Sequence, residues 1–100
     1  MYFIFWKFKP KEGYEAEFEN AYGPHGVWTD LFSRVNGYLG TSLLKEIDSD
    51  NIYIAVDRWD SKETFHSFKE RYEIDYETID RHFEEITEFE IQIGEFTTEQ

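Results

Sequence analysis

Residues 53–72, "YIAVDRWDSKETFHSFKERY", contain a change of hydrophobic period that decides the fold. Up to Trp59 the residues are mostly β-branched or aromatic, which indicates a strand. Beyond this point the apolar residues recur at helical spacing, and Asp60 or Ser61 is suited to cap the N-terminus of a helix. The stretch therefore predicts a strand that passes directly into a helix, with His66 placed among aromatic rings.

Length and charge restrict the class of protein. A chain of 100 residues indicates one domain, residues 1–100, with a modest core. Its 22 acidic and 10 basic residues give a formal net charge of −12, which repels phosphate backbones and anionic lipids. We therefore expect neither nucleic acid nor a membrane as partner. With no cysteine, no long apolar run and no signal-peptide pattern at the N-terminus, a cytoplasmic protein is expected.

Hydrophobic periodicity along the rest of the chain predicts the order of elements. In chain order these are a strand (2–8), a helix (12–22), a short helix opened by Pro24 (24–35), a hairpin (38–59), two helices with a break near 73–75 (60–86), and a last strand (89–93). The glutamates of the last strand, including Glu90, are expected to form a solvated face. This β-α-β-β-α-β order indicates an α+β, ferredoxin-like antiparallel sheet with helices on one face.

The first strand is apolar on both faces, and this predicts a partner. Ile4 and Trp6 point to one side of a strand, and Phe3 and Phe5 to the other. Helices cover only one side of the predicted sheet, so a second subunit is the simplest cover for the other. We expect a homodimer that pairs through the sheet face.

With this order of elements, the sequence resembles the antibiotic biosynthesis monooxygenase superfamily over nearly its whole length. The resemblance is carried by the aromatic first strand, by the strand that ends on Trp59 before a short polar link and a helix, and by the stretches "YGPHGVWTDLF" (22–32), "NGYLGTSLL" (36–44) and "YIAVDRWDSKETFHSF" (53–68). It implies a dimeric α+β barrel, in which two chains pair their sheets. It is weak for activity, because the superfamily includes cofactor-independent monooxygenases, haem-degrading enzymes, small-molecule isomerases and members with no known role.

The haem-degrading branch of this superfamily can be compared residue by residue. Its members use an Asn on the first strand and a Trp and a His on the helices after the third. Counting from Trp59, the Trp position falls on Phe68 and the His position near Thr78, and the first strand contains no Asn. The triad is not matched, although His82 is close enough for an alignment shift to supply one member. We expect no cofactor.

His66 is the candidate general base. It lies about 100° round the predicted helix from Phe65, at the edge of the apolar stripe, and an unperturbed pKa of about 6.5 suits proton removal at neutral pH. Tyr53 or Trp6 would then donate a hydrogen bond to the developing anion. The competing interpretation is a surface histidine bonded to solvent or to a nearby acid. Burial beside a polar group would favour catalysis, and exposure would favour a non-catalytic protein.

The high ring content predicts either a pocket or simply a core. A pocket between the sheet and the 24–35 helix would be lined by Trp28, Phe32 and Tyr53 and would be apolar with a few polar groups. The predicted substrate-binding residues are Trp28, Phe32, Trp59, Phe65 and Tyr72. Packing of the same rings in the core is the alternative. No metal site is expected, because Glu63 and His66 form a single E-x-x-H pair and no second cluster accompanies it. Neither a phosphate loop nor a nucleophile elbow is present in the sequence.

Three functions remain open at the level of sequence. The resemblance implies a small-molecule-binding protein, and a cofactor-independent monooxygenase of a small aromatic or polyketide-like substrate that itself supplies the electrons for O2. The first alternative is a non-catalytic binding or interaction protein of the same fold. The second is an isomerase of a small metabolite, or a haem-degrading relative.

Overall fold

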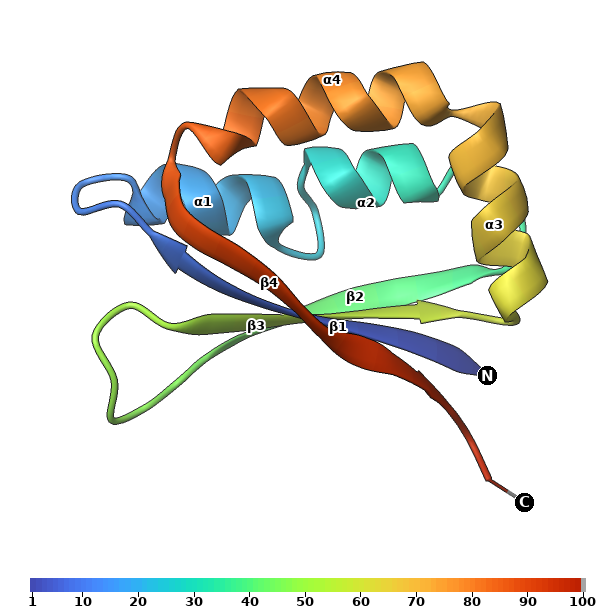
Figure 1. Cartoon of the computed structure of the whole chain (residues 1–100), viewed down its shortest axis with the longest axis horizontal. Helices are drawn as coiled ribbons and strands as arrows, with labels where there is room; N and C mark the ends of the chain where they lie inside the picture. Colours follow the sequence, from blue (N-terminus) through green and yellow to red (C-terminus); the bar gives the residue numbers. More distant parts are fainter. Residues whose placement is uncertain (100) are drawn as a thin grey trace.

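A computed structural model describes residues 1–99 of the chain. It contains four strands and four helices in the order β1 (Tyr2–Pro10), α1 (Glu15–Tyr22), α2 (Val27–Phe32), β2 (Tyr38–Lys45), β3 (Tyr53–Trp59), α3 (Lys62–Arg71), α4 (Glu73–Glu84) and β4 (Thr87–Thr97). The strands form one antiparallel sheet in the order β2-β3-β1-β4. All four helices lie on the same side of it (Figure 1). The predicted ferredoxin-like α+β fold is confirmed.

The junction between β3 and α3 is built as residues 53–72 predict. Ser61 is the N-cap of α3, and its Oγ accepts a hydrogen bond of 3.1 Å from the Thr64 backbone N–H. The cap lets the chain turn from the sheet into the helix, which brings Phe68 down onto Trp59 with ring centroids 5.2 Å apart. Both rings are fully buried. This junction therefore anchors α3 to the sheet.

Several element boundaries differ from those predicted; α1, for example, begins at Glu15 and not at residue 12. Pro24 precedes α2 instead of opening it, because the helix begins after Gly26, the extended N-cap residue. The break between α3 and α4 is the single residue Tyr72, which lies just before the predicted break. Strand β4 is longer than predicted and runs to Thr97, since it pairs with β1 along its length.

The two faces of the sheet separate along β1 as the alternation predicts. Ile4, Trp6 and Phe8 point to the helices, together with Tyr53, Ala55, Asp57 and Trp59 of the neighbouring strand β3. The opposite face, which no helix covers, is also largely apolar (Figure 1). Its apolar side chains, as the strand register places them, are Phe3, Phe5, Leu44, Ile54, Val56, Phe89, Ile91 and Phe96.

The register of β4 against β1 overturns one expectation from the sequence. Glu90 pairs with Phe8, which faces the helices. The glutamate therefore lies on the helix side of the sheet and not on a solvated face, while Ile91 points to the uncovered side.

Between residues 1 and 99, no helix has both the length and the apolar character needed to cross a membrane.

We predict that Ser61→Ala destabilises the protein by about 1 kcal/mol, because the first turn of α3 loses its side-chain cap. Ser67→Ala is the matched control, since Ser67 is exposed on the same helix. Urea unfolding of the two variants measures the difference in the free energy of unfolding. Equal stabilities would show that the cap does not hold the β3–α3 junction.

Candidate functional site

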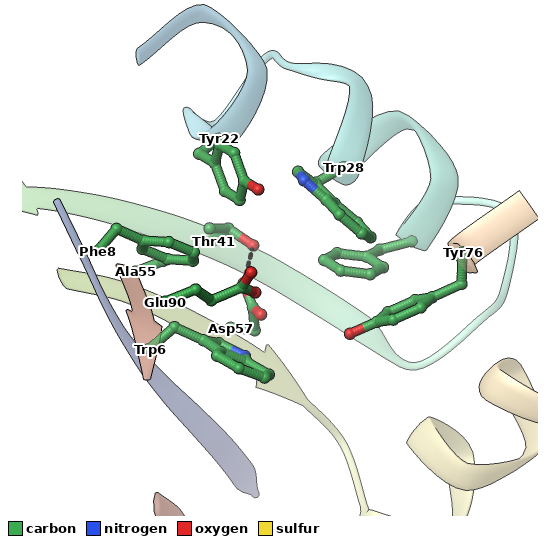
Figure 2. A pocket seen from close by; sticks show the side chains of 10 residues that line it. Trp6, Phe8, Tyr22, Trp28, Thr41, Ala55, Asp57, Tyr76 and Glu90 are labelled. Carbon is green, nitrogen blue, oxygen red and sulfur yellow. Dashed lines mark hydrogen bonds between the residues drawn. The ribbon is translucent and has the colours of Figure 1, made fainter. Parts of the chain in front are cut away.

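A small cavity lies between the helix-facing side of the sheet and helices α1, α2 and α4 (Figure 2). About 30 Å³ within it is open to groups the size of a water molecule. All four strands and three helices contribute to its wall, which is lined by Trp6, Phe8, Tyr22, Trp28, Phe32, Thr41, Ala55, Asp57, Tyr76 and Glu90.

Six aromatic rings form most of this wall. Trp6 and Phe8 come from β1, and the other four rings come from the helices above the sheet. The Trp28 ring is in contact with the rings of Tyr76 and Phe32, with centroids 5.0 and 5.8 Å apart. Buried aromatic surface excludes water and lowers the local dielectric, so polar groups in this wall interact strongly with a bound molecule.

Asp57 is the most deeply buried acid of the cavity. It sits on β3 with only 8% of its surface exposed, and its Oδ1 accepts a hydrogen bond of 2.8 Å from the Thr41 hydroxyl. Because Thr41 uses its proton in this bond, the Tyr38 hydroxyl donates to the Thr41 oxygen, at 2.5 Å. Burial raises the pKa of Asp57 to about 6, although the Thr41 hydrogen bond and the charge of Arg58 lower it.

Glu90 is the second acid of the cavity, and it comes from β4. Figure 2 shows its carboxyl group pointing inward, towards the region of Asp57 and Thr41. Burial raises the pKa of Glu90 to about 7, and the negative charges of Asp80 and Glu84 on α4 raise it further in the same direction. Two carboxyl groups that exchange protons near neutral pH therefore line one cavity, an arrangement typical of acid–base sites.

The cavity also contains hydrogen-bond donors. The Trp28 Nε1–H is buried and makes no hydrogen bond of ordinary geometry among residues 1–99, although it lies near enough to the Tyr22 hydroxyl to lower the pKa of that group. Burial raises the pKa of Tyr22 and of Tyr76, and nearby carboxylates raise both further, so the two hydroxyls keep their protons at neutral pH. An unpaired indole N–H beside protonated phenols can stabilise negative charge on a bound molecule.

Three of the residues that sequence analysis selected meet at this cavity, namely Trp6, Trp28 and Phe32. Tyr53 lies on the same face of the sheet, but its hydroxyl donates a hydrogen bond to the carboxylate of Glu19, and the residue does not line the cavity. The remaining three predicted substrate-binding residues, Trp59, Phe65 and Tyr72, pack around Phe68 in the core.

The structure places His66 outside the cavity. Its side chain is exposed on α3, where its ring meets the edge of the Phe65 ring at 5.9 Å between centroids. Position at the edge of the apolar stripe is therefore insufficient, because α3 turns this edge to solvent. Exposure of His66 is expected for a non-catalytic protein, and it counts against His66 as the general base. A catalytic function therefore requires a base among the residues that line the cavity.

The sequence contained a signal for one of the missed residues. Asp57 lies two residues from Ala55 and two from Trp59 in a strand, so period two alone places it on their buried face. Glu90 gave no such signal, because the face it occupies depends on the register of β4 against β1. Tyr76 likewise depends on how α4 lies over α2.

Comparison with known proteins identifies the family of this fold. The family model described as antibiotic biosynthesis monooxygenase matches residues 1–75. The chain belongs to this family. Tyr76 and Glu90 of the cavity lie beyond the matched residues. Among curated protein sequences, none matches the chain.

Several solved structures have the same fold as this chain. SnoaB from Streptomyces nogalater, a cofactor-independent oxygenase, superposes with a TM-score of 0.79; its two structures are 24% and 22% identical in sequence to this chain, and the alignments cover 99% of this chain and 93% of SnoaB. A protein from Nitrosomonas europaea described as a putative antibiotic biosynthesis monooxygenase gives 0.69 at 14% identity, over 98% of both chains. At these identities the likeness establishes the fold and not the activity.

MhuD is a third structural relative, and its structure contains two manganese protoporphyrin IX molecules per active site. It has a TM-score of 0.60 and 18% identity, over 98% of this chain and 94% of MhuD. In this chain the cavity does not fit such a group: none of its ten lining residues is a histidine, and the open space of about 30 Å³ is far smaller than a porphyrin.

The raised pKa of Asp57 gives a testable pH dependence. The folded protein binds the Asp57 proton more tightly than the unfolded chain does, so this group favours folding below about pH 4 and loses that effect as pH rises through about 6. We predict that Asp57→Asn gains stability relative to wild type between pH 4 and pH 8, by about 2–3 kcal/mol.

Urea unfolding at a series of pH values measures this difference. Asp30→Asn, an exposed acid on α2, is the control and should keep a nearly constant difference from wild type. If Asp57→Asn instead became more stable relative to wild type as the pH falls, the pKa of Asp57 would have to be lowered in the folded protein.

Proposed function

We propose that this protein binds a small aromatic or polyketide-like molecule in the cavity and oxidises it with O2 without a cofactor, with Asp57 as the general base. The observation that carries the proposal is a buried carboxyl group with a pKa of about 6 inside an aromatic cavity. A base whose pKa lies near the working pH is both ionised and able to hold the proton it removes.

Thr41 and Tyr38 support this assignment. Their hydroxyls form a chain of donors directed at Asp57 Oδ1, which favours the ionised carboxylate and leaves Oδ2 to accept a proton. Removal of a phenolic or activated C–H proton from the bound molecule would leave an anion in the cavity. The unpaired Trp28 Nε1–H is the group best suited to donate to its oxygen.

The reaction balances without a further redox partner. The deprotonated substrate supplies electrons to O2, and a new carbon–oxygen bond forms as a peroxide. Loss of water from this peroxide converts the substrate CH2 group to a carbonyl. One oxygen atom enters the product and the other leaves as water, so the four electrons lost by carbon are those gained by O2.

The size of the cavity sets a condition on this function. Sites for drug-sized ligands measure about 300–1,000 Å³, whereas the open space here is about 30 Å³. A multi-ring substrate therefore requires the rings of Trp28 and Tyr76 to move apart. Helix α4 suits such a movement, because it contributes no fully buried residue to the core.

A non-catalytic binding protein is the second candidate, and the small cavity and the exposure of His66 favour it. It predicts ligand binding without O2 uptake. An isomerase would use the same base and donor, and it would convert its substrate equally well in the absence of O2. Oxygen consumption therefore separates the oxygenase from the other two functions, and conversion of the substrate without O2 separates the isomerase from the binding protein.

We also propose that a second copy of the chain covers the free face of the sheet. This face presents Phe3 and Phe5 beside the half-exposed Ile91 and Phe96, and the Phe5 and Phe96 rings meet edge to face at 5.1 Å. An apolar sheet surface of this kind marks an interaction site. Because a two-fold axis pairs identical patches, a self-complementary apolar face is suited to a homodimer.

We predict that Asp57→Asn lowers the rate of O2 consumption with an anthrone-type substrate by about 100-fold or more, since the base is lost while the shape is kept. An oxygen electrode measures the rate, with Asp30→Asn as the control for a lost surface charge. If the rate is unchanged in Asp57→Asn but falls in His66→Ala, the general base is His66 and not Asp57. A wild-type rate no higher than that without protein would contradict oxygenase function.

We predict that the wild-type protein elutes as a dimer and that Phe5→Glu shifts it to the monomer, because a charge on the free face is desolvated in the paired form. Ile74→Glu is the matched control, since Ile74 is 79% exposed on α4. Size-exclusion chromatography with light scattering gives the mass. A wild-type monomer at about 100 μM would contradict pairing through the sheet.

A further inference from the structure

The charges that line the cavity are all of one sign. Its wall contains six rings and the two carboxyl groups of Asp57 and Glu90, and none of its ten residues is a lysine, arginine or histidine. Buried carboxylates in proteins are normally paired with a cation or coordinate a metal. Within residues 1–99, neither of these two carboxylates forms a salt bridge.

The nearest cations are engaged elsewhere. Arg58 follows Asp57 in β3 and therefore points to the opposite face of the sheet, where it donates a hydrogen bond of 3.1 Å to Ser42. Lys69 of α3 does not line the cavity, but its Nζ lies over the ring of Tyr76, 4.5 Å from the ring centre, so one face of this ring already contacts a cation. Its charge acts on Asp80, whose pKa it lowers against the effect of burial.

We propose that the cavity is a cage for an ammonium group, so that its ligand is a small molecule with a protonated or quaternary amine. The cation would lie against the rings of Trp6, Trp28 and Tyr76, with Glu90 and Asp57 as counter-charges. Aromatic faces attract cations through the ring quadrupole, and the attraction grows when water is excluded. This inference rests on the proposed function in taking the same cavity as the ligand site, and it adds a charged amine to the ligand. Because the open space is about 30 Å³, an ammonium head group enters only if the rings of Trp28 and Tyr76 move apart, as for the substrate.

The unpaired Trp28 N–H points to a second feature of the ligand. Only 7% of the Trp28 residue is exposed, and its N–H makes no hydrogen bond of ordinary geometry in the part of the chain that the structure describes, although it acts on the nearby Tyr22 hydroxyl. A ligand with a hydroxyl or carbonyl oxygen near the ammonium group would satisfy this donor. An amino alcohol meets both requirements, whereas a carboxylate or phosphate ligand would be repelled by the two acids.

Charge outside the cavity favours the same class of ligand. Asp80 and Glu84 of α4 act on Glu90 at the cavity, and the chain as a whole has a formal net charge of −12. A negative surface around an apolar cleft attracts cations and speeds their association at low salt. Ligand affinity should therefore fall as ionic strength rises.

Affinity should rise with pH as the two acids ionise. The groups that act on Glu90 are Tyr22 on α1 and Tyr76, Asp80 and Glu84 on α4. Those that act on Asp57 are Tyr38 and Thr41 on β2, Tyr76 on α4 and, from the opposite face of the sheet, Arg58. Both tyrosines remain neutral, and Asp80 and Glu84 are acids whose ionisation adds to the attraction. Every titration near these two carboxylates therefore changes the affinity in the same direction.

Choline and its neutral isostere 3,3-dimethylbutan-1-ol provide the direct test. They have similar shapes and the same hydroxyl, and they differ in the charge of the head group. Isothermal titration calorimetry and tryptophan fluorescence of the full chain at pH 8 should give choline an affinity about tenfold or more above that of the alcohol. Equal affinity for the two molecules, or no binding of choline, would overturn the proposal.

Two variants locate the site. Glu90→Gln removes a counter-charge with little change of shape and should weaken choline binding about fivefold or more, whereas Glu17→Gln, an exposed acid on α1, should leave it unchanged. Trp6→Leu should weaken choline more than the alcohol, because it removes ring face but keeps apolar surface. Choline binding that survives both Glu90→Gln and Trp6→Leu would place the cation elsewhere and contradict the cage.

The outcome is separable from that of the proposed function. Selective binding of choline without any O2 uptake would uphold the cage and contradict the oxygenase. O2 uptake with an uncharged aromatic substrate, together with equal affinity for choline and the alcohol, would support the oxygenase and contradict the cage.

Discussion

The packing of Trp59 at the end of β3 is the interaction on which the rest of the structure depends. The indole is fully buried and contacts Phe32 of α2, Tyr38 of β2, and Phe65 and Phe68 of α3. It thus joins two helices to the sheet at one point. Helix α2 is only six residues long and cannot be stable alone, so this contact fixes where it lies. The position of Trp28 over the sheet, and therefore the cavity, follows from it.

The cavity combines an apolar wall with two acids, which is costly for folding and useful for chemistry. Ionised Asp57 has lost most of its hydration and receives one hydrogen bond from Thr41 in return. The same loss of solvation that raises its pKa makes it a stronger base and increases its attraction for a cation. A residue retained under these conditions is more readily explained by ligand binding or catalysis than by stability, because an apolar residue would pack there without the penalty.

Family membership and the cavity inform different parts of the functional argument. The family match establishes the family, and the likeness to SnoaB establishes the fold. The residues on which the functional proposals rest, namely Asp57 with its hydroxyl chain, Glu90 and Trp28, come from the cavity itself. Two of the lining residues, Tyr76 and Glu90, lie outside the matched residues. The ligand class is therefore argued from local chemistry and not from the family.

The sequence by itself determined the order of elements, the two apolar faces of β1 and the junction at Trp59, because each depends on local period, capping and turn residues. It also selected Trp6, Trp28 and Phe32, which the structure brings together at the cavity, whereas Tyr53, predicted to line the same pocket, does not line it. It pointed to His66 and away from Glu90, since residue type and spacing on one element do not say what covers that element. Only the tertiary structure decided where these two side chains lie. The register of β4 on β1 turns Glu90 towards the helices, and the direction of α3 leaves His66 exposed to solvent. The protonation of Asp57 and Glu90 was likewise set by burial, a property of the assembled fold.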